Sequence, residues 1–197
     1  METEDVYQKR YLEHQERKKR ILTNNFGNKE WKVYTKKEQD SFLEVLEGRC
    51  SQRVFNNQEI DLSPILSALE LAPSSCDRHG ILTSTITERN EKDLLSGLLV
   101  GGVGWINRAK AILLLKADMD CYKSPAEKDN MPYLDAGVII QTVYLTSEVF
   151  NIGCCYVNPN IRDENKQFFY DRFNIGENEV FCGALALGSF DLKHDRK

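Results

Sequence analysis

The sequence has few features of zinc-binding, secreted or membrane-spanning proteins. Its six cysteines include no CxxC pair and no Cys/His cluster at metal-ligand spacing, so a zinc site is not expected. No basic-then-apolar signal pattern opens the chain, and Asp135, Gln141 and Glu148 interrupt its most apolar helical segment, 131–151. We therefore expect no secretion signal and no membrane span, and the cysteine usage predicts a reduced, cytoplasmic protein.

An excess of positive charge is also missing. The 197 residues include 26 Lys and Arg against 30 Asp and Glu, which gives a net charge of -4. General binding to a phosphate backbone is therefore disfavoured. The hydrophobic content of 41% is ordinary, so disorder is not expected, and the length suits one domain, or barely two, with a core of its own.

The first forty residues differ in character from the rest, because they are rich in charged and amide side chains. Helical spacing of Tyr7, Tyr11 and Ile21 predicts an exposed helix over 5–23, which packs on the main body or a partner. A linker is expected over 24–32, so that a charged segment, 1–34, precedes a main domain, 35–197. We interpret the basic run 16–20 as a solvated face, with binding of a partner or a nucleic acid as the alternative.

The main domain mixes helices and strands, which predicts an α/β or α+β fold. An apolar strand over 111–117 indicates a sheet covered on both faces, and 131–151 is expected to form a central buried helix that Gly153 terminates. In the helix over 163–173, Phe168, Phe169 and Phe173 are expected on one side. The remaining expected elements are a helix from the capping box Thr35-x-x-Glu38 to Gly48, a helix begun by Asp61 or Ser63 that stops at Ala72, a strand over 81–87, a helix over 92–99, a turn over 101–104, and strands over 154–157 and 180–187.

Two polar segments are the candidate sites. In 49–55, alternate residues Arg49, Ser51 and Arg53 would share one surface if the segment is extended. Two guanidiniums and a hydroxyl could hold a phosphate or a flat, carbonyl-rich ring. The second segment, 72–80, carries two serines, Asp77 and His79. Solvated arginines and an ordinary turn are the plainer alternatives for these two segments.

In their order along the chain these segments resemble the FMN-dependent nitroreductase family. The first reads Arg49-x-Ser51-x-Arg53-x-Phe55, the second Ala72-Pro-Ser-Ser-Cys-Asp77, and a late strand ends in Leu187-Gly188. The segment from Asp135 to Tyr156 is similar to the central helix of that family and the strand after it. The resemblance covers about residues 40 to 190 and depends on the ordered set, since each motif alone is weak.

The resemblance implies an α+β fold, a three-layer α/β/α sandwich whose central sheet is mixed but mainly antiparallel and whose central helix is buried. It implies a homodimer with FMN at the subunit interface, and two-step hydride transfer from NADH or NADPH through FMN to a small-molecule acceptor. No catalytic side chain is then required, because the flavin carries the reaction. The implied cofactor-binding residues are Arg49, Ser51, Arg53, Pro73, Ser74, Ser75, Asp77, Tyr156, Val157, Asn158, Lys193 and Arg196, with Lys197 as a further candidate for the phosphate.

The chain departs from the family pattern beside the second motif. Asp77 stands where the family has Asn, and His79-Gly80-Ile81 stands where Gln-Pro-Trp is common. An ionised Asp accepts hydrogen bonds but cannot donate them, and its charge would disfavour nearby negative charge unless Arg78 neutralises it. The alternative is therefore a relative that binds flavin without NAD(P)H turnover and acts as a sensor or interaction protein.

Overall fold

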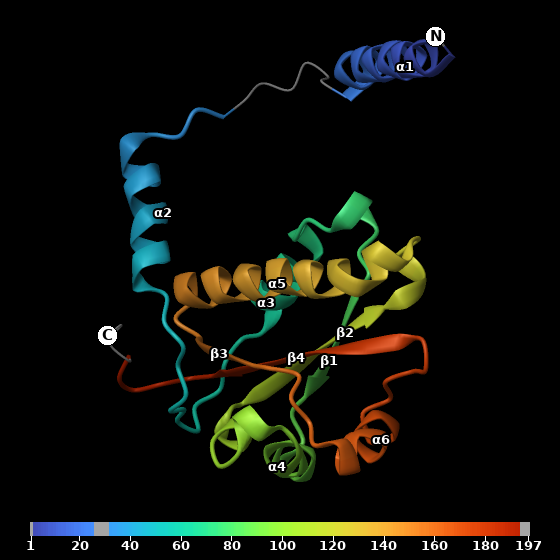
Figure 1. Ribbon diagram of the computed structural model, residues 1–197. Coiled ribbons are helices and arrows are strands. Elements are labelled where there is room, and N and C mark those ends of the chain that lie inside the picture. Colours follow the sequence, from blue (N-terminus) through green and yellow to red (C-terminus); the bar gives the residue numbers. More distant parts are fainter. Residues whose placement is uncertain (1, 26–31, 194–197) are drawn as a thin grey trace. The chain divides into compact units, whose positions relative to one another are not determined.

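The computed structural model describes residues 2–25 and 32–193 (Figure 1). The chain divides into two compact units, Met1–Asp40 and Ser41–Lys197. Among the described residues, no helix is both long and apolar enough to cross a membrane.

The N-terminal unit contains α1 (Glu2–Asn25) and the start of α2 (Lys36–Gly48). The predicted exposed helix is confirmed and extends by a few residues at each end. Residues 26–31 of the expected linker lie outside the described residues. The capping box is formed as predicted: the Thr35 N–H donates to Glu38 Oε2 at 2.8 Å, and the Glu38 N–H donates to Thr35 Oγ1 at 3.3 Å. A domain boundary at residue 34 stays a prediction.

The larger unit is built on one four-stranded sheet in the order β1-β2-β4-β3 (Figure 1). Its strands are β1 (Ile81–Ile86), β2 (Ala111–Asp118), β3 (Gly153–Val157) and β4 (Glu179–Gly188). Every pairing is antiparallel, so no parallel pair of the expected mixed sheet occurs among the described strands. The two central strands, β2 and β4, are buried over most of their length.

Helices cover both faces of this sheet, as the apolar strand over 111–117 predicts. Alternate residues of β2 point to opposite faces: Leu113 and Leu115 enter a core with α3 (Ser63–Leu71) and α5 (Pro125–Val149). Ile112 and Leu114 enter a second core with α4 (Arg89–Leu98) and α6 (Asp163–Arg172). The result is the predicted three-layer α/β/α arrangement. Short 3-10 turns complete the fold: η1 (Ser75–Asp77), η2 (Val100–Gly102), η3 (Ile106–Arg108) and η4 (Met119–Cys121).

The central helix α5 differs from its prediction in three ways. It begins earlier, where Ser124 Oγ accepts a hydrogen bond from the Glu127 N–H at 3.2 Å. It ends at Val149, and Asn151, with a φ of 53°, together with the bond from the Ile152 N–H to the Ser147 carbonyl, closes the last turn, so the prediction of Gly153 as the cap is wrong. Its sheet-facing side is buried, whereas Tyr133 and Leu134 on the other side are exposed in the single chain.

The three phenylalanines in α6 and directly after it do not share one environment. Phe169 is buried at 0% exposure and Phe173 is buried beside it, but Phe168 is 52% exposed. Neighbouring residues on a helix point about 100° apart, so Phe168 and Phe169 cannot both face the sheet. The prediction is wrong for Phe168 and confirmed for the other two.

Gly183 lies beside a bulge in β4 and packs closely on β3. At Gly183 φ is +110°, and a Cβ there would lie 2.5 Å from the Tyr156 ring and 2.7 Å from the Val157 carbonyl oxygen. We expect Gly183→Ala to lower the free energy of unfolding by about 2–3 kcal/mol, from backbone strain and overpacking. Urea unfolding measures the loss.

The matched control for this substitution is Gly97→Ala in α4. A Cβ at Gly97 meets nothing within 4 Å, so Ala should leave stability unchanged or raise it by about 0.5–1 kcal/mol. A loss of stability at Gly183 no greater than that at Gly97 would contradict the close packing of Tyr156 on the bulge.

Candidate functional site

The segment over 49–56 runs in an extended form along the ends of β3 and β4. The Gln52 N–H donates to the Cys154 carbonyl at 2.9 Å, and the Asn56 N–H donates to the Ser189 carbonyl at 2.9 Å. The Gln52 side chain is 2% exposed and donates to two further backbone carbonyls. The Gln52 side chain packs directly against the backbone at residue 153. This contact requires glycine, because a Cβ at position 153 would lie 2.8 Å from Gln52 Cγ. This anchoring leaves Arg49 and Ser51 half-buried and Arg53 exposed beside the buried Gln52.

Tyr144 on α5 joins three of the predicted site residues. The Arg49 guanidinium lies over its ring, 4.9 Å from the ring centre. The Ser51 hydroxyl lies 3.1 Å from the Tyr144 hydroxyl, which also accepts a 2.8 Å hydrogen bond from the Tyr156 N–H. Burial raises the pKa of Tyr144, so its hydroxyl stays protonated at neutral pH. Tyr144 therefore fixes the position of the first motif relative to β3.

A small cavity next to Tyr144 is lined by two cationic side chains and by the carboxylate of Glu148. Both Arg49 and Lys193 line it, and Lys193 forms an ion pair with Glu148 at the end of α5. The structure therefore brings Arg49 and Lys193 of the predicted set together at this cavity, whereas Ser51 contacts Tyr144 without lining the cavity. Arg196 and Lys197 lie outside the described residues.

Arg53 lies in a different environment from Arg49. Its guanidinium is 6.0 Å from the centre of the Trp105 ring, and that ring stacks on Phe55 at 6.5 Å. The Arg53 side chain is exposed. The two guanidiniums that the alternating pattern placed on one surface thus contact different aromatic rings. Arg53 also interacts with the Cys155 thiol, which Ser51 and Tyr144 contact as well.

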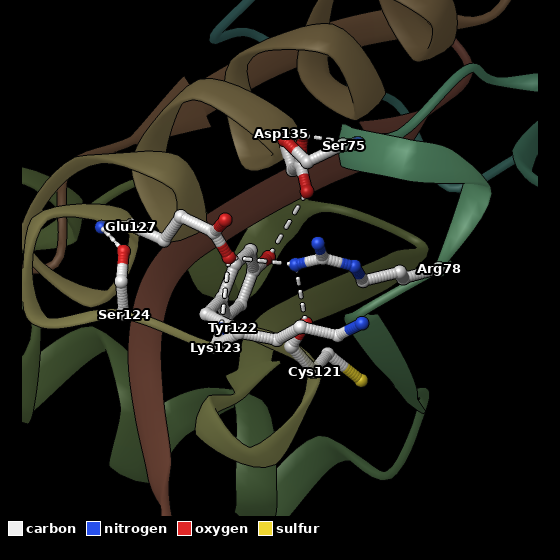
Figure 2. Close-up of polar contacts among 8 residues, drawn as sticks. All are labelled: Ser75, Arg78, Cys121, Tyr122, Lys123, Ser124, Glu127 and Asp135. Atoms are coloured by element: carbon white, nitrogen blue, oxygen red, sulfur yellow. Dashed lines mark hydrogen bonds and ion pairs between the residues drawn. The ribbon is translucent and has the colours of Figure 1, made fainter. Parts of the chain in front are cut away.

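The second motif forms a tight turn after α3. Pro73 is exposed, and Ser74 Oγ accepts a hydrogen bond from the His79 N–H at 2.9 Å. Asp77 is exposed and its carboxylate lies 3.0 Å from His79 Nε2. Arg78 does not neutralise Asp77: its guanidinium donates to Glu127 at 2.7 Å and to the Cys121 carbonyl at 2.8 Å (Figure 2). The turn therefore presents a carboxylate and an imidazole to its surroundings.

The two motifs are attached to different parts of α5. The first motif is held at Tyr144, whereas Ser75 of the second donates to Asp135 (Figure 2). Nine residues of helix separate these anchors, or about 14 Å at 1.5 Å per residue. The predicted residues of one chain thus form two groups rather than a single cluster.

The residues after Cys155 lie at the end of β3. The Tyr156 hydroxyl donates to the Cys182 carbonyl at 2.8 Å, Val157 is buried, and Asn158 is exposed just beyond the strand. Cys154 and Cys155 are both buried. Burial raises the pKa of each of these thiols, and none of the six cysteines, all in described parts of the chain, forms a disulfide.

Sequence reasoning missed Tyr144 and the roles of Asp135 and Glu148. Two of these carry a usable signal, because Asp135 and Glu148 interrupt an otherwise apolar helix, and charged residues in such positions are rarely buried without a partner. Tyr144 carries no such signal, since an aromatic residue in an apolar helix is ordinary. Within the described ranges no cluster of three or more His, Cys, Asp or Glu could hold a metal ion.

Solved structures share this fold. An FMN-dependent nitroreductase from Clostridium difficile has 19% sequence identity and a TM-score of 0.67, over 79% of this chain and 91% of that one. A nitroreductase family protein from Streptococcus pneumoniae has 16% identity and a TM-score of 0.68, over 79% and 94%. A protein from Desulfovibrio desulfuricans, provisionally named a nitroreductase and solved with FMN, has 18% identity and a TM-score of 0.67, over 79% and 90%.

Among curated protein sequences nothing matches. The sequence pattern of the nitroreductase family, however, matches residues 46–189. That range is well over half of the chain, and it contains both polar motifs, the whole sheet and Tyr144. The chain therefore belongs to the nitroreductase family.

Proposed function

We propose that this chain is an FMN-dependent oxidoreductase that passes hydride from NADH or NADPH to a small-molecule acceptor in two steps. Membership of the nitroreductase family and a neighbour of the same fold solved with FMN support this proposal. Bound FMN supplies the hydride-transfer chemistry, so the protein has to bind, orient and shield it rather than provide an acid, base or nucleophile. The observation that carries the proposal is the convergence of Arg49, Ser51 and Tyr156 on Tyr144.

The residues around the small cavity have the chemistry that a phosphate monoester needs. Arg49 and Lys193 line the cavity and supply positive charge, and Ser51, which contacts the lining residue Tyr144, supplies a hydroxyl donor nearby. Guanidinium groups and hydroxyls are frequent partners of phosphate oxygens. We assign these three residues to the FMN phosphate, with Arg53 toward the ring system. Arg196 remains a candidate from the sequence.

The second motif and the end of β3 complete the proposed cofactor site. Pro73, Ser74, Ser75 and Asp77 would approach the flavin from the other subunit, with the backbone of Tyr156, Val157 and Asn158 beside its reactive edge. Two groups in this set are already used within the chain: the Ser75 hydroxyl donates to Asp135, and the Tyr156 N–H donates to Tyr144. Asp77, by contrast, is 89% exposed and can accept a hydrogen bond from a ring N–H.

We propose that the partner is a second copy of this chain. Large apolar side chains are exposed on α3, within α5 and at its C-terminal end: Leu66, Leu71, Tyr133, Leu134, Val149 and Phe150. Exposed apolar surface of this kind marks interaction sites, and a dimer would supply the second motif that one chain holds apart from the first. A cytoplasmic location is proposed with it, since the six free thiols suit a reducing compartment.

The absorption spectrum of the purified protein with FMN tests the proposed function. We expect oxidised-flavin bands between about 300 and 550 nm that stay with the protein and bleach anaerobically on addition of NADH or NADPH. Protein that cannot be reconstituted with FMN would contradict the cofactor assignment. Light scattering on the same sample should give twice the mass of one chain.

One observation favours the alternative, a relative that binds FMN without turnover. Arg78 is paired with Glu127, and among the described side chains His79 is the one that pairs with the exposed Asp77 carboxylate. An uncompensated carboxylate disfavours the build-up of negative charge nearby. Flavin bands that persist with both nucleotides would support this alternative, in which the protein acts as a sensor or interaction partner.

A further inference from the structure

The turn that follows α3 has a strained backbone. Cys76, Asp77 and His79 have φ angles of 53°, 57° and 50°, in the left-handed region that residues with a side chain seldom adopt. Each such residue costs free energy and persists only where the surrounding structure holds it. Three of them within four positions require anchors on both sides of the turn.

A buried carboxylate is the first anchor. Asp135 on α5 is 5% exposed, and its Oδ1 accepts hydrogen bonds from the Ser75 N–H at 3.0 Å and the Ser75 hydroxyl at 2.8 Å. Its Oδ2 accepts from the Tyr122 hydroxyl at 3.1 Å. Figure 2 shows Asp135 between the turn on one side and Tyr122 on the other. One carboxylate thus ties the start of the turn to the central helix.

Arg78 and Gly80 form the second anchor. The Arg78 guanidinium reaches across to Glu127 at the start of α5 and to the Cys121 carbonyl (Figure 2). This ion pair, together with the Lys123 N–H, lowers the pKa of Glu127. The Asp118 N–H donates a hydrogen bond to the Gly80 carbonyl at 2.9 Å. Gly80 also packs closely on Tyr122, because a Cβ at position 80 would lie 3.0 Å from the Tyr122 hydroxyl oxygen. The end of the turn is therefore fixed to β2 and the loop after it.

The hydrogen-bond geometry around Asp135 argues against a purely stabilising role. Burying a carboxylate has a desolvation cost, and its hydrogen bonds do no more than offset that cost. Apolar replacements of buried charged groups are therefore often neutral or stabilising. All three donors of Asp135 come from the turn or from Tyr122. The effect of the Asp135 carboxylate is therefore to fix the turn, which exposes Asp77 and His79 on its outer side.

We propose that Asp135 is a positioning residue: it holds the 74–79 turn in its strained conformation, so that the turn is preorganised for the flavin bound by the partner subunit. The inference rests on the proposed function, because the ligand is taken to be FMN. Preorganisation raises affinity, since the binding free energy does not have to order the turn.

The test compares Asp135→Ala, Asp135→Asn and Tyr122→Phe in the full chain. We expect Asp135→Ala to speed amide hydrogen exchange across 73–80 and to weaken FMN binding about tenfold, the effect of losing buried hydrogen bonds to a charged group. Asp135→Asn keeps an acceptor oxygen for Ser75, so exchange and the FMN Kd should stay within about twofold of the wild type. Ser75→Ala, at a half-exposed position, should shift both readouts in the same direction as Asp135→Ala, even if the latter folds poorly.

Tyr122→Phe is the matched control, because it removes a hydrogen bond from the same carboxylate on the side away from the turn. It should lower the thermal midpoint but leave the FMN Kd nearly unchanged. Equal weakening of FMN binding by Tyr122→Phe and Ser75→Ala would overturn the proposal and leave Asp135 a structural residue. Unchanged exchange over 73–80 in Asp135→Ala would also overturn it. If exchange responds but the wild type binds no FMN, the anchoring stands and the proposed function fails.

Discussion

Replacing Arg49 by Glu is expected to weaken FMN binding about a thousandfold, which corresponds to about 4 kcal/mol. Arg49 lines the cavity proposed for the phosphate and lies 4.9 Å from the centre of the Tyr144 ring. The substitution removes charge-assisted hydrogen bonds worth about 1.5–3 kcal/mol and adds repulsion between a carboxylate and the phosphate. Fluorescence titration of the apoprotein with FMN measures the change.

The fold should survive this substitution. The Arg49 side chain is half-buried, and its cation–π contact contributes only about 0.5–1 kcal/mol. Lys166→Glu, on the exposed surface of α6, makes the same change in net charge and should leave the FMN Kd within about twofold of the wild type if long-range charge effects are screened. Equal effects of the two substitutions would show that Arg49 acts only through net charge, and would remove the phosphate assignment.

Lys193→Gln separates the two cations of the cavity. Lys193 already forms an ion pair with Glu148, so part of its charge is compensated in the free protein. We therefore expect a smaller loss of FMN affinity than for Arg49→Glu, about tenfold. A loss as large as that of Arg49→Glu would instead assign Lys193 the leading role at the phosphate.

Local signals in the sequence were sufficient for most of the fold. The capping box at Thr35 depends only on residues three apart, and it forms as predicted. The apolar strand over 111–117 predicts a doubly covered sheet because it leaves no polar face for solvent, and both cores meet there. The end of α5 was harder to predict from the sequence. Asn151 and Gly153 can each adopt a left-handed backbone conformation, and only tertiary packing decides which of them closes the helix.

The candidate site depends on contacts that local patterns do not encode. Alternation along 49–53 correctly separates buried Gln52 from its neighbours, but it cannot show that Arg49 lies over Tyr144 while Arg53 lies over Trp105. These rings are about 50 to 95 residues away in the sequence. Asp135 was visible as a charge in an apolar helix, yet its partners, Ser75 and Tyr122, come from two other segments. The positions of motifs were therefore predictable, and the residues that hold them in place were not.

Phe169→Ala is expected to lower the free energy of unfolding by about 3–5 kcal/mol, the usual cost of a cavity in place of a buried aromatic ring. Phe169 has no exposed surface, and its ring centre lies 4.9 Å from that of Phe173 and 4.8 Å from that of Phe181. These contacts attach α6 to β4 in the second core. Urea unfolding at a fixed protein concentration measures the loss, because dimerisation would make stability depend on concentration.

The adjacent Phe168 is the matched control, because it has the same side chain on the same helix but is 52% exposed. Phe168→Ala should change the free energy of unfolding by no more than about 0.5 kcal/mol. A loss of several kcal/mol at Phe168 would show that its exposed ring is covered by a second copy or another partner, and a small loss at Phe169 would contradict the packing of α6 on β4. The difference between two neighbouring phenylalanines thus measures which side of α6 faces the sheet, the feature that helical periodicity alone left undecided.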